Sequence, residues 1–189
     1  FFSDYYKVKT DDDFSDELQL PNLAPNEPVK LSASFAARIA QSNNANYTIT
    51  ANGKNMTSGN FGITIGGTTD TYATILGITD EFTPTSSPLD IQLKFNRPDN
   101  PFNEGWLDYI ELNLRRQLLM AGDQMHFRDI RTMGNAVSKF TLGNATPELI
   151  VWDVTNPLQP KRQEASLSGN ELSFGAAPDT LVEFIAFGN

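Results

Sequence analysis

The clearest structural signal in the chain is the stretch VKLSASFAARIA, residues 29–40. Apolar residues stand at every second position, and most positions between them carry lysine, serine or arginine. The apolar set consists of Val29, Leu31, Ala33, Phe35, Ala37 and Ile39. Strict period two is the pattern of a β-strand with one face on a core and the other toward solvent. The stretch therefore predicts a long, half-buried strand.

Further short apolar runs follow along the chain, separated by clusters of Asn, Gly, Ser and Pro that favour turns. The expected strands fall within residues 46–53, 61–67, 71–82, 89–96, 104–119, 125–130, 137–143, 149–154, 163–169, 171–175 and 181–187. Helical periodicity is absent, apart from a turn near residues 115–120. Many short strands with regular turns predict an all-β fold, an antiparallel β-sandwich of jelly-roll type.

The run LIVWDVTNPLQP, residues 149–160, predicts both a strand and its end. Apolar residues occupy both faces until Asp153, so we expect both faces of this strand to be covered. Pro157 has no N–H for a neighbouring strand and pushes Asn156 toward extended geometry. The ladder should therefore stop here.

The domain organisation expected from the sequence is an arm followed by one domain. Residues 1–28 contain TDDDFSDE and three prolines, which predicts an acidic, proline-containing arm outside the sheets. That acidic run lacks the glycine and distal glutamate of an EF-hand, so a calcium loop is not favoured. Residues 29–189 are expected to form a single β-sandwich domain, since a hydrophobic content of 39% is ordinary for a globular protein.

Charge and cysteine content exclude several classes of function. The net charge of −9 argues against nucleic acid as a partner, because gripping phosphates requires clustered Lys and Arg. The absence of cysteine excludes disulfides, thiolate zinc sites and a cysteine nucleophile. No run of about 18 apolar residues occurs. The start at Phe1, without a methionine or a signal-like segment, is expected of a mature or excised portion.

Catalytic groups are sparse. His126 is the sole histidine, and no serine lies in a G-x-S-x-G elbow, so a Ser-His-Asp triad is not indicated. A lone histidine in a strand is expected to be structural. We assign no catalytic, metal-binding or cofactor-binding residue, and we expect no cofactor.

The segment EGWLDYIE, residues 104–111, carries three acids and two aromatic residues. Some jelly-roll glycosidases place their acids on alternate residues of one strand. On an unbroken strand Asp108 and Glu111 project from opposite faces, whereas a retaining glycosidase needs its pair about 5 Å apart; a β-bulge would change this. Trp106 and Tyr109 are candidate ligand-binding residues that could stack on a sugar, with core packing as the competing interpretation.

Three segments resemble, in order, the region just upstream of the peptidase domain in gingipain-like type IX secretion sortases of Bacteroidetes, the PorU family. They are WLDYIELNLRRQLLMAGDQMHFRD at 106–129, LIVWDVTNPLQP at 149–160 and LVEFIAFGN at 181–189. SDYYKV at 3–8 resembles the point where this module begins.

The resemblance implies a cell-surface protein of the outer membrane that removes the sorting signal from exported cargo and links the cargo to anionic lipopolysaccharide. In that family the activity belongs to a caspase-like domain with a Cys-His dyad. Because this chain has no cysteine, it is expected to be a non-catalytic accessory part, with the peptidase beyond Asn189. The implied partners are that peptidase domain of the same polypeptide, exported cargo proteins and surface glycan.

Three hypotheses result. The first is an accessory β-sandwich domain of such a sortase, serving interdomain packing or cargo recognition. The second is a carbohydrate-binding module, and the third is a jelly-roll glycoside hydrolase. In each case the predicted core consists of Val29, Leu31, Phe35, Ile39, Ile91, Leu93, Ile110, Leu112, Ile150, Trp152 and Phe184.

Overall fold

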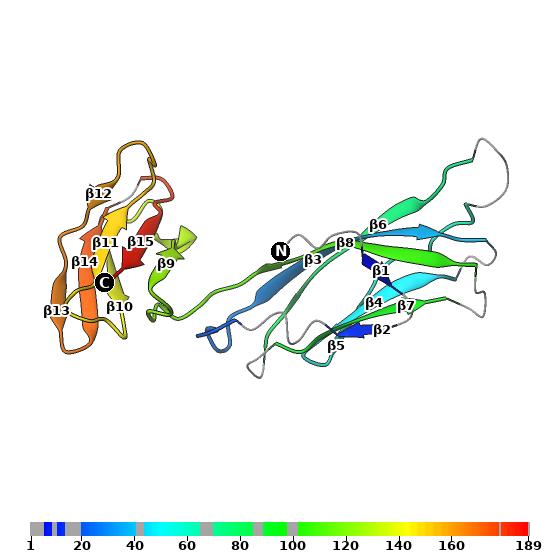
Figure 1. The fold of residues 1–189 in the computed structure, drawn as a ribbon, viewed down its shortest axis with the longest axis horizontal. Helices are drawn as coiled ribbons and strands as arrows, with labels where there is room; N and C mark the ends of the chain where they lie inside the picture. Colours follow the sequence, from blue (N-terminus) through cyan, green and yellow to red (C-terminus); the bar gives the residue numbers. More distant parts are fainter. Residues whose placement is uncertain are drawn as a thin grey trace. The chain divides into compact units, whose positions relative to one another are not determined.

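A computed structural model describes the chain as two compact units, residues 1–116 and 117–189, called here the N-terminal and the C-terminal unit. It describes the backbone of residues 6–8 and 11–13 and all of residues 20–40, 44–64, 70–84, 89–97, 102–177 and 179–188. Each unit is an antiparallel β-structure around its own apolar core (Figure 1). The single domain expected over residues 29–189 is therefore wrong, because the buried side chains form two separate clusters.

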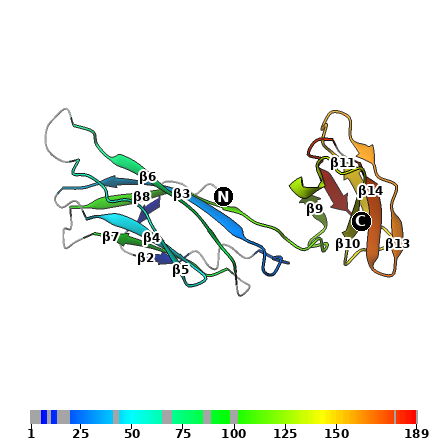
Figure 2. The ribbon, with the colours of Figure 1, turned by 180° about the vertical axis from the view of Figure 1, so that it is seen from behind.

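The described residues of the N-terminal unit form eight strands arranged as a jelly roll. Its strands are β1 (Tyr6–Val8), β2 (Asp11–Asp13), β3 (Val29–Arg38), β4 (Asn46–Ala51), β5 (Lys54–Thr57), β6 (Thr74–Phe82), β7 (Ile91–Asn96) and β8 (Glu104–Asn113). One sheet, the β8 sheet, has the order β1-β8-β3-β6, and the other, the β7 sheet, has the order β2-β7-β4-β5. Both are visible in Figures 1 and 2.

The pairing within this unit is nested. β1 pairs with β8, β2 with β7, β3 with β6 and β4 with β5, all antiparallel. The chain is therefore a long hairpin rolled into two layers, and the pairs β3–β8 and β4–β7 close the roll. This strand order is that of a jelly roll, so the predicted fold class is confirmed.

The acidic arm expected at residues 1–28 is wrong, since this part of the chain contributes β1 and β2 to the two sheets. Both strands are three residues long, and β2 consists of three aspartates. Asp11 lies opposite Lys94 on β7, and Asp13 lies opposite Gln92. β1 alternates only once, as Tyr6-Lys7-Val8, and β2 has no apolar residue. Three residues are too few for a hydrophobic pattern to set the register, so the pairing depends on the backbone of the partner strand.

Stacked aromatic rings fill the centre of the N-terminal core. The Tyr47 ring is fully buried and stacks on Phe35 and Phe95, with ring centroids 4.2 and 4.7 Å apart, and meets Phe61 edge-on at 5.8 Å. Gly105 on β8 leaves room for this ring, because a Cβ there would lie 1.9 Å from the Tyr47 hydroxyl oxygen. Close packing of this kind explains a glycine inside a central strand.

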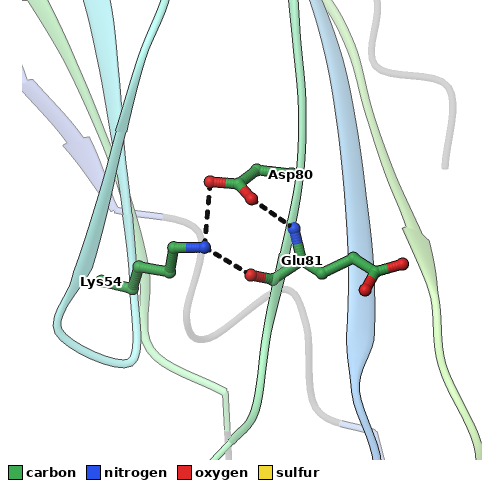
Figure 3. A network of polar contacts seen from close by, with 3 residues as sticks. All are labelled: Lys54, Asp80 and Glu81. Atoms are coloured by element: carbon green, nitrogen blue, oxygen red, sulfur yellow. Dashed lines mark hydrogen bonds and ion pairs between the residues drawn. The ribbon is translucent and has the colours of Figure 1, made fainter.

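Lys54 links the two sheets at one edge of the N-terminal unit (Figure 3). Lys54 belongs to β5, and its side chain extends to β6. There its Nζ lies 2.9 Å from Asp80 Oδ2 and 2.5 Å from the carbonyl oxygen of Glu81. The other carboxylate oxygen of Asp80 accepts a hydrogen bond from the Glu81 N–H at 2.8 Å. The Lys54 ammonium, and then the Glu81 amide, lower the pKa of Asp80.

The C-terminal unit is a smaller sandwich. Its elements are β9 (Gln124–Phe127), the 3₁₀ turn η1 (Ile130–Thr132), β10 (Ser138–Leu142), β11 (Ile150–Asp153), β12 (Lys161–Arg162), β13 (Ser166–Ser168), β14 (Glu171–Ala176) and β15 (Phe184–Phe187). The sheet orders are β12-β11-β15-β9 and β10-β14-β13. Phe184 lies at the core centre, with its ring centroid 5.0 Å from those of Phe140 and Phe174 and 5.5 Å from that of Phe127.

The predicted end of the strand at 149–160 is confirmed, because β11 stops at Asp153. The Asp153 carboxylate accepts a hydrogen bond from the Thr155 N–H at 2.9 Å, and the Asn156 side chain accepts one from the Leu158 N–H at 3.1 Å. Both aspartate and asparagine here form side-chain turns that compete with the ladder. The side-chain turns at Asp153 and Asn156 therefore help to end the strand, in addition to the missing N–H of Pro157.

Most of the predicted core is confirmed. Buried residues are Val29, Leu31, Phe35, Ile39, Ile91, Leu93, Ile110 and Phe184. Leu112, Ile150 and Trp152 are only partly buried. Leu112 packs against the edge of the N-terminal core, whereas Ile150 and Trp152 are not part of the C-terminal core cluster. Val151 is the β11 residue that enters the core, and the pleat turns Ile150 and Trp152 to the opposite, only partly covered face.

Candidate functional site: an aromatic surface on the jelly roll

Strand β8 contains a β-bulge that changes which of its residues face the solvent. Tyr109 lies opposite Ser34 of β3, and Leu107 lies opposite the next residue, Phe35. Asp108 is therefore an extra residue without an opposite partner. A bulge inserts one residue and shifts the alternation beyond it by one position.

The bulge overturns the expectation that Asp108 and Glu111 project from opposite faces. Leu107 and Ile110, on either side of the bulge, are both buried. Asp108 and Glu111 are exposed, and Glu111 accepts a hydrogen bond from the Asn113 side chain at 3.5 Å. Both acids thus lie on the solvent face of the β8 sheet.

The two aromatic candidates of β8 also lie on this solvent face. Trp106 and Tyr109 are half-buried and are opposite Ala36 and Ser34, two residues of β3 that alternate with its core positions. Because Ser34 and Ala36 are two residues apart on β3, the positions opposite them on β8 are about 7 Å apart along the strand. Trp106 and Tyr109 therefore belong to the outer, partly covered face of the β8 sheet and not to the buried core cluster, and they occupy neighbouring positions on that face.

On the β3 side, small residues stand next to Tyr109 on the outer face of the sheet. Ser34 and Ala36 of β3 lie opposite Gly77 and Ile75 of β6. Gly77 carries no side chain, and an added Cβ would lie 3.1 Å from the carbonyl oxygen of Ala33. On the β3 side of β8 the neighbouring residues are therefore small next to Tyr109, while on the other side Lys7 of β1 is the residue opposite Trp106.

Residues at one end of the sheet extend the aromatic surface. Tyr72, just before β6, is 63% exposed, and its ring centroid lies 6.4 Å from that of Trp106. The Arg38 guanidinium lies over the Tyr72 ring, with Cζ 4.7 Å from the centroid. Ile75 beside them is 72% exposed. We call these residues, with Trp106 and Tyr109, the aromatic platform of the β8 sheet.

Sequence reasoning found Trp106 and Tyr109 but missed Tyr72 and Arg38. Both belong to segments more than thirty residues from β8, and only the β3–β6 and β3–β8 pairing brings them to Trp106. Tyr72 lies outside a strand, so no periodic pattern marks it.

His126 lies on β9 in the C-terminal unit and is exposed. Its Nε2 is 3.4 Å from the Gln124 side-chain nitrogen. Among the residues that the structure describes, no group of three His, Cys, Asp or Glu side chains is placed to hold a metal ion. Within the same described ranges, no helix has the length and apolar character needed to cross a bilayer.

Comparison with known proteins gives a likeness among solved structures. No family model and no curated protein matches the chain. Among solved structures, the chain is similar to the crystal structure of dimeric latent PorU from Porphyromonas gingivalis, with a TM-score of 0.77 and 16% sequence identity. The match covers 100% of this chain and 18% of that chain. The chain therefore has the fold of a region of PorU.

Proposed function

We propose that this chain is a non-catalytic accessory region of a PorU-like sortase at the outer-membrane surface, and that it helps to position exported cargo for the peptidase domain of the same polypeptide. The observation that carries the proposal is the likeness to PorU over the whole chain at a TM-score of 0.77. The ordered resemblance of residues 106–129, 149–160 and 181–189 supports it independently.

The composition of the chain supports an accessory role. It has no cysteine, so it cannot supply the nucleophile of a cysteine peptidase. His126 is exposed, and the hydrogen bond described for its ring is with an amide side chain. A pair of sandwich units without a nucleophile can contribute by positioning the substrate, because a substrate displaced by about 1 Å can react about a hundredfold more slowly.

The connection between β9 and β10 is the surface that we assign to contact with the peptidase domain or the cargo. Ile130, Met133 and Val137 project from it, and the first and last are 68% and 71% exposed. Within eight residues, one connection thus exposes three large apolar side chains, and a concentration of exposed apolar groups is typical of protein contacts. We call this group the β9–β10 patch.

The test substitutes exposed apolar residues of the β9–β10 patch in the full-length protein. We expect Ile130→Ser combined with Val137→Ser to leave uncleaved cargo at the cell surface, while cleavage of a short sorting-signal peptide stays at the parental rate. Mass spectrometry of surface cargo measures the retained signal. Ile63→Ser, at an isoleucine of the N-terminal unit that is 54% exposed, is the matched control.

Two results would contradict the proposal. One is parental cargo processing by a variant that is folded and present at the surface in normal amounts. The other is peptidase activity of the isolated chain that disappears in His126→Ala, because the chain would then be catalytic itself.

A further inference from the structure

We propose that the aromatic platform of the β8 sheet binds a neutral polysaccharide chain. This goes beyond the positioning role, since the platform lies on the N-terminal unit and its residues are different from the β9–β10 patch. The starting observation is that Trp106, Tyr109 and Tyr72 lie outside the core on one sheet face. The core of this unit is completed by other aromatic residues, so the fold itself does not require them there.

The geometry suits a chain of pyranose rings. A sugar ring presents an apolar C–H face that packs on an aromatic ring, while its hydroxyl groups point outward and need polar partners. Trp106 lies between Tyr72, at a centroid distance of 6.4 Å, and Tyr109, at the next same-face position of β8. Aromatic residues at these neighbouring positions, beside the small residues Ser34 and Gly77, can pack on more than one sugar of a chain.

Arg38 holds one of these rings in place before a ligand arrives. Its guanidinium lies over the Tyr72 ring at 4.7 Å, a cation–π arrangement. Arg38 comes from the end of β3, so the position of an exposed ring that lies outside any strand is tied to a central strand. Immobilising an aromatic side chain in advance lowers the entropy that binding would otherwise cost.

Acidic side chains lie on the same face as the aromatic rings. Asp108 and Glu111 are exposed on the same face, and the bulge places Asp108 directly between Leu107 and Tyr109. Carboxylates accept hydrogen bonds from sugar hydroxyls, and bonds to a charged acceptor are the stronger kind. The hydroxyl of Ser32 accepts a bond from Thr79 at 3.4 Å, which shows that this face also carries hydroxyl groups.

The charge of the unit favours a neutral ligand over an anionic one. Residues 1–116 carry 15 acidic and 9 basic residues, a net charge of −6. On the platform, the Arg38 guanidinium already lies over Tyr72, while the two carboxylates face solvent. Lys7 of β1 is the residue opposite Trp106, so the excess of negative charge belongs to the unit as a whole. That excess opposes association with a sulfated or uronic-acid chain.

The test measures binding of the whole chain to soluble polysaccharides by titration calorimetry. The neutral probes are laminarin, mannan, galactan and dextran, and dextran sulfate is the charged counterpart of dextran. We expect at least one neutral probe to bind. Trp106→Ala and Tyr72→Ala should each raise its Kd about tenfold or more, the loss of one stacking contact.

Conservative variants separate stacking from folding. Tyr72→Phe and Trp106→Phe keep a ring and should stay within about threefold of the parent. Leu158→Ala, at a leucine of the C-terminal unit that is 90% exposed, should leave Kd unchanged. In a Trp152→Phe background Trp106 is the remaining tryptophan, and a saturating neutral probe should lower its quenching by acrylamide at least twofold.

Three results would overturn the inference. They are binding of none of the neutral probes, binding that Trp106→Ala and Tyr72→Ala leave intact, and preference for dextran sulfate over every neutral probe. Sedimentation supplies a further check, because a dimer that Trp106→Ala converts to a monomer would identify the platform as a contact between two copies. None of these results bears on cargo processing by the β9–β10 patch, so the two proposals fail separately.

Discussion

Replacing Gly105 by alanine tests the packing of the jelly roll most directly. The new Cβ would lie 1.9 Å from the Tyr47 hydroxyl oxygen, 2.9 Å from Tyr47 Cζ and 3.0 Å from Phe95 Cε1. The Tyr47 ring cannot move aside easily, because Phe35 and Phe95 stack on it at 4.2 and 4.7 Å. Overpacking a core costs about 1–3 kcal/mol. We expect a loss near the upper end, about 3 kcal/mol, in the free energy of unfolding of the N-terminal unit.

The assay uses the two tryptophans, of which Trp106 lies in the N-terminal unit and Trp152 in the C-terminal unit. Chemical denaturation is followed by fluorescence in Trp152→Phe and Trp106→Phe backgrounds, so that each unit is observed by itself. Gly105→Ala should shift the transition seen by Trp106 and leave the one seen by Trp152 in place. Two transitions are to be fitted separately, because a two-unit chain need not unfold in one step.

Two comparisons make this prediction specific. Gly62→Ala adds the same methyl group where nothing lies within 4 Å and should change stability by less than about 0.5 kcal/mol. Gly105→Ala in a Tyr47→Phe background removes the closest atom and should recover part of the loss, a coupling that a double-mutant cycle measures. A shift below about 0.5 kcal/mol for Gly105→Ala alone would refute the packing argument.

Three further predictions concern stability. Phe184→Ala should cost the C-terminal unit about 3–5 kcal/mol, because Phe184 is buried among three other phenylalanines, and an unchanged Trp152 transition would contradict this. Trp152→Ala should cost less, about 1–2 kcal/mol, since the indole is half-buried; denaturation followed by circular dichroism would show a core-sized loss if this is wrong. Lys54 lowers the pKa of Asp80, so the Asp80 carboxylate stabilises the fold above its unfolded pKa near 3.8, and this contribution disappears as the pH falls through the folded pKa. Lys54→Met should therefore flatten the acid side of a plot of unfolding free energy against pH, and a plot of unchanged shape would count against the contact.

The amino-acid sequence alone determined the fold class and most of the core. Alternation at residues 29–40 requires one apolar face and one polar face, and β3 has both. Local turn chemistry likewise predicted where β11 ends, because Asn156 and Pro157 act on their own backbone. These features are local, so neighbouring residues in the chain carry all the information that they need.

The division into two units needed the tertiary structure. Period-two patterns continue on both sides of Arg116, and no Gly- or Pro-rich linker marks the boundary. Strands of either unit look alike in sequence, so only the packing shows which ones share a core. β1 and β2 were missed for a related reason, because strands of three residues are too short to show a periodic pattern and depend on the partner that they pair with.

The candidate site also could be predicted only in part from the sequence. Trp106 and Tyr109 were visible as aromatic residues of one strand, but a bulge at Asp108 decided that they share a face, and a bulge is a property of two paired strands. Tyr72 and Arg38 reach Trp106 only through the pairing of β3 with β6 and β8. Contacts between residues distant in the chain depend on register, and register is decided by the packing of whole sheets.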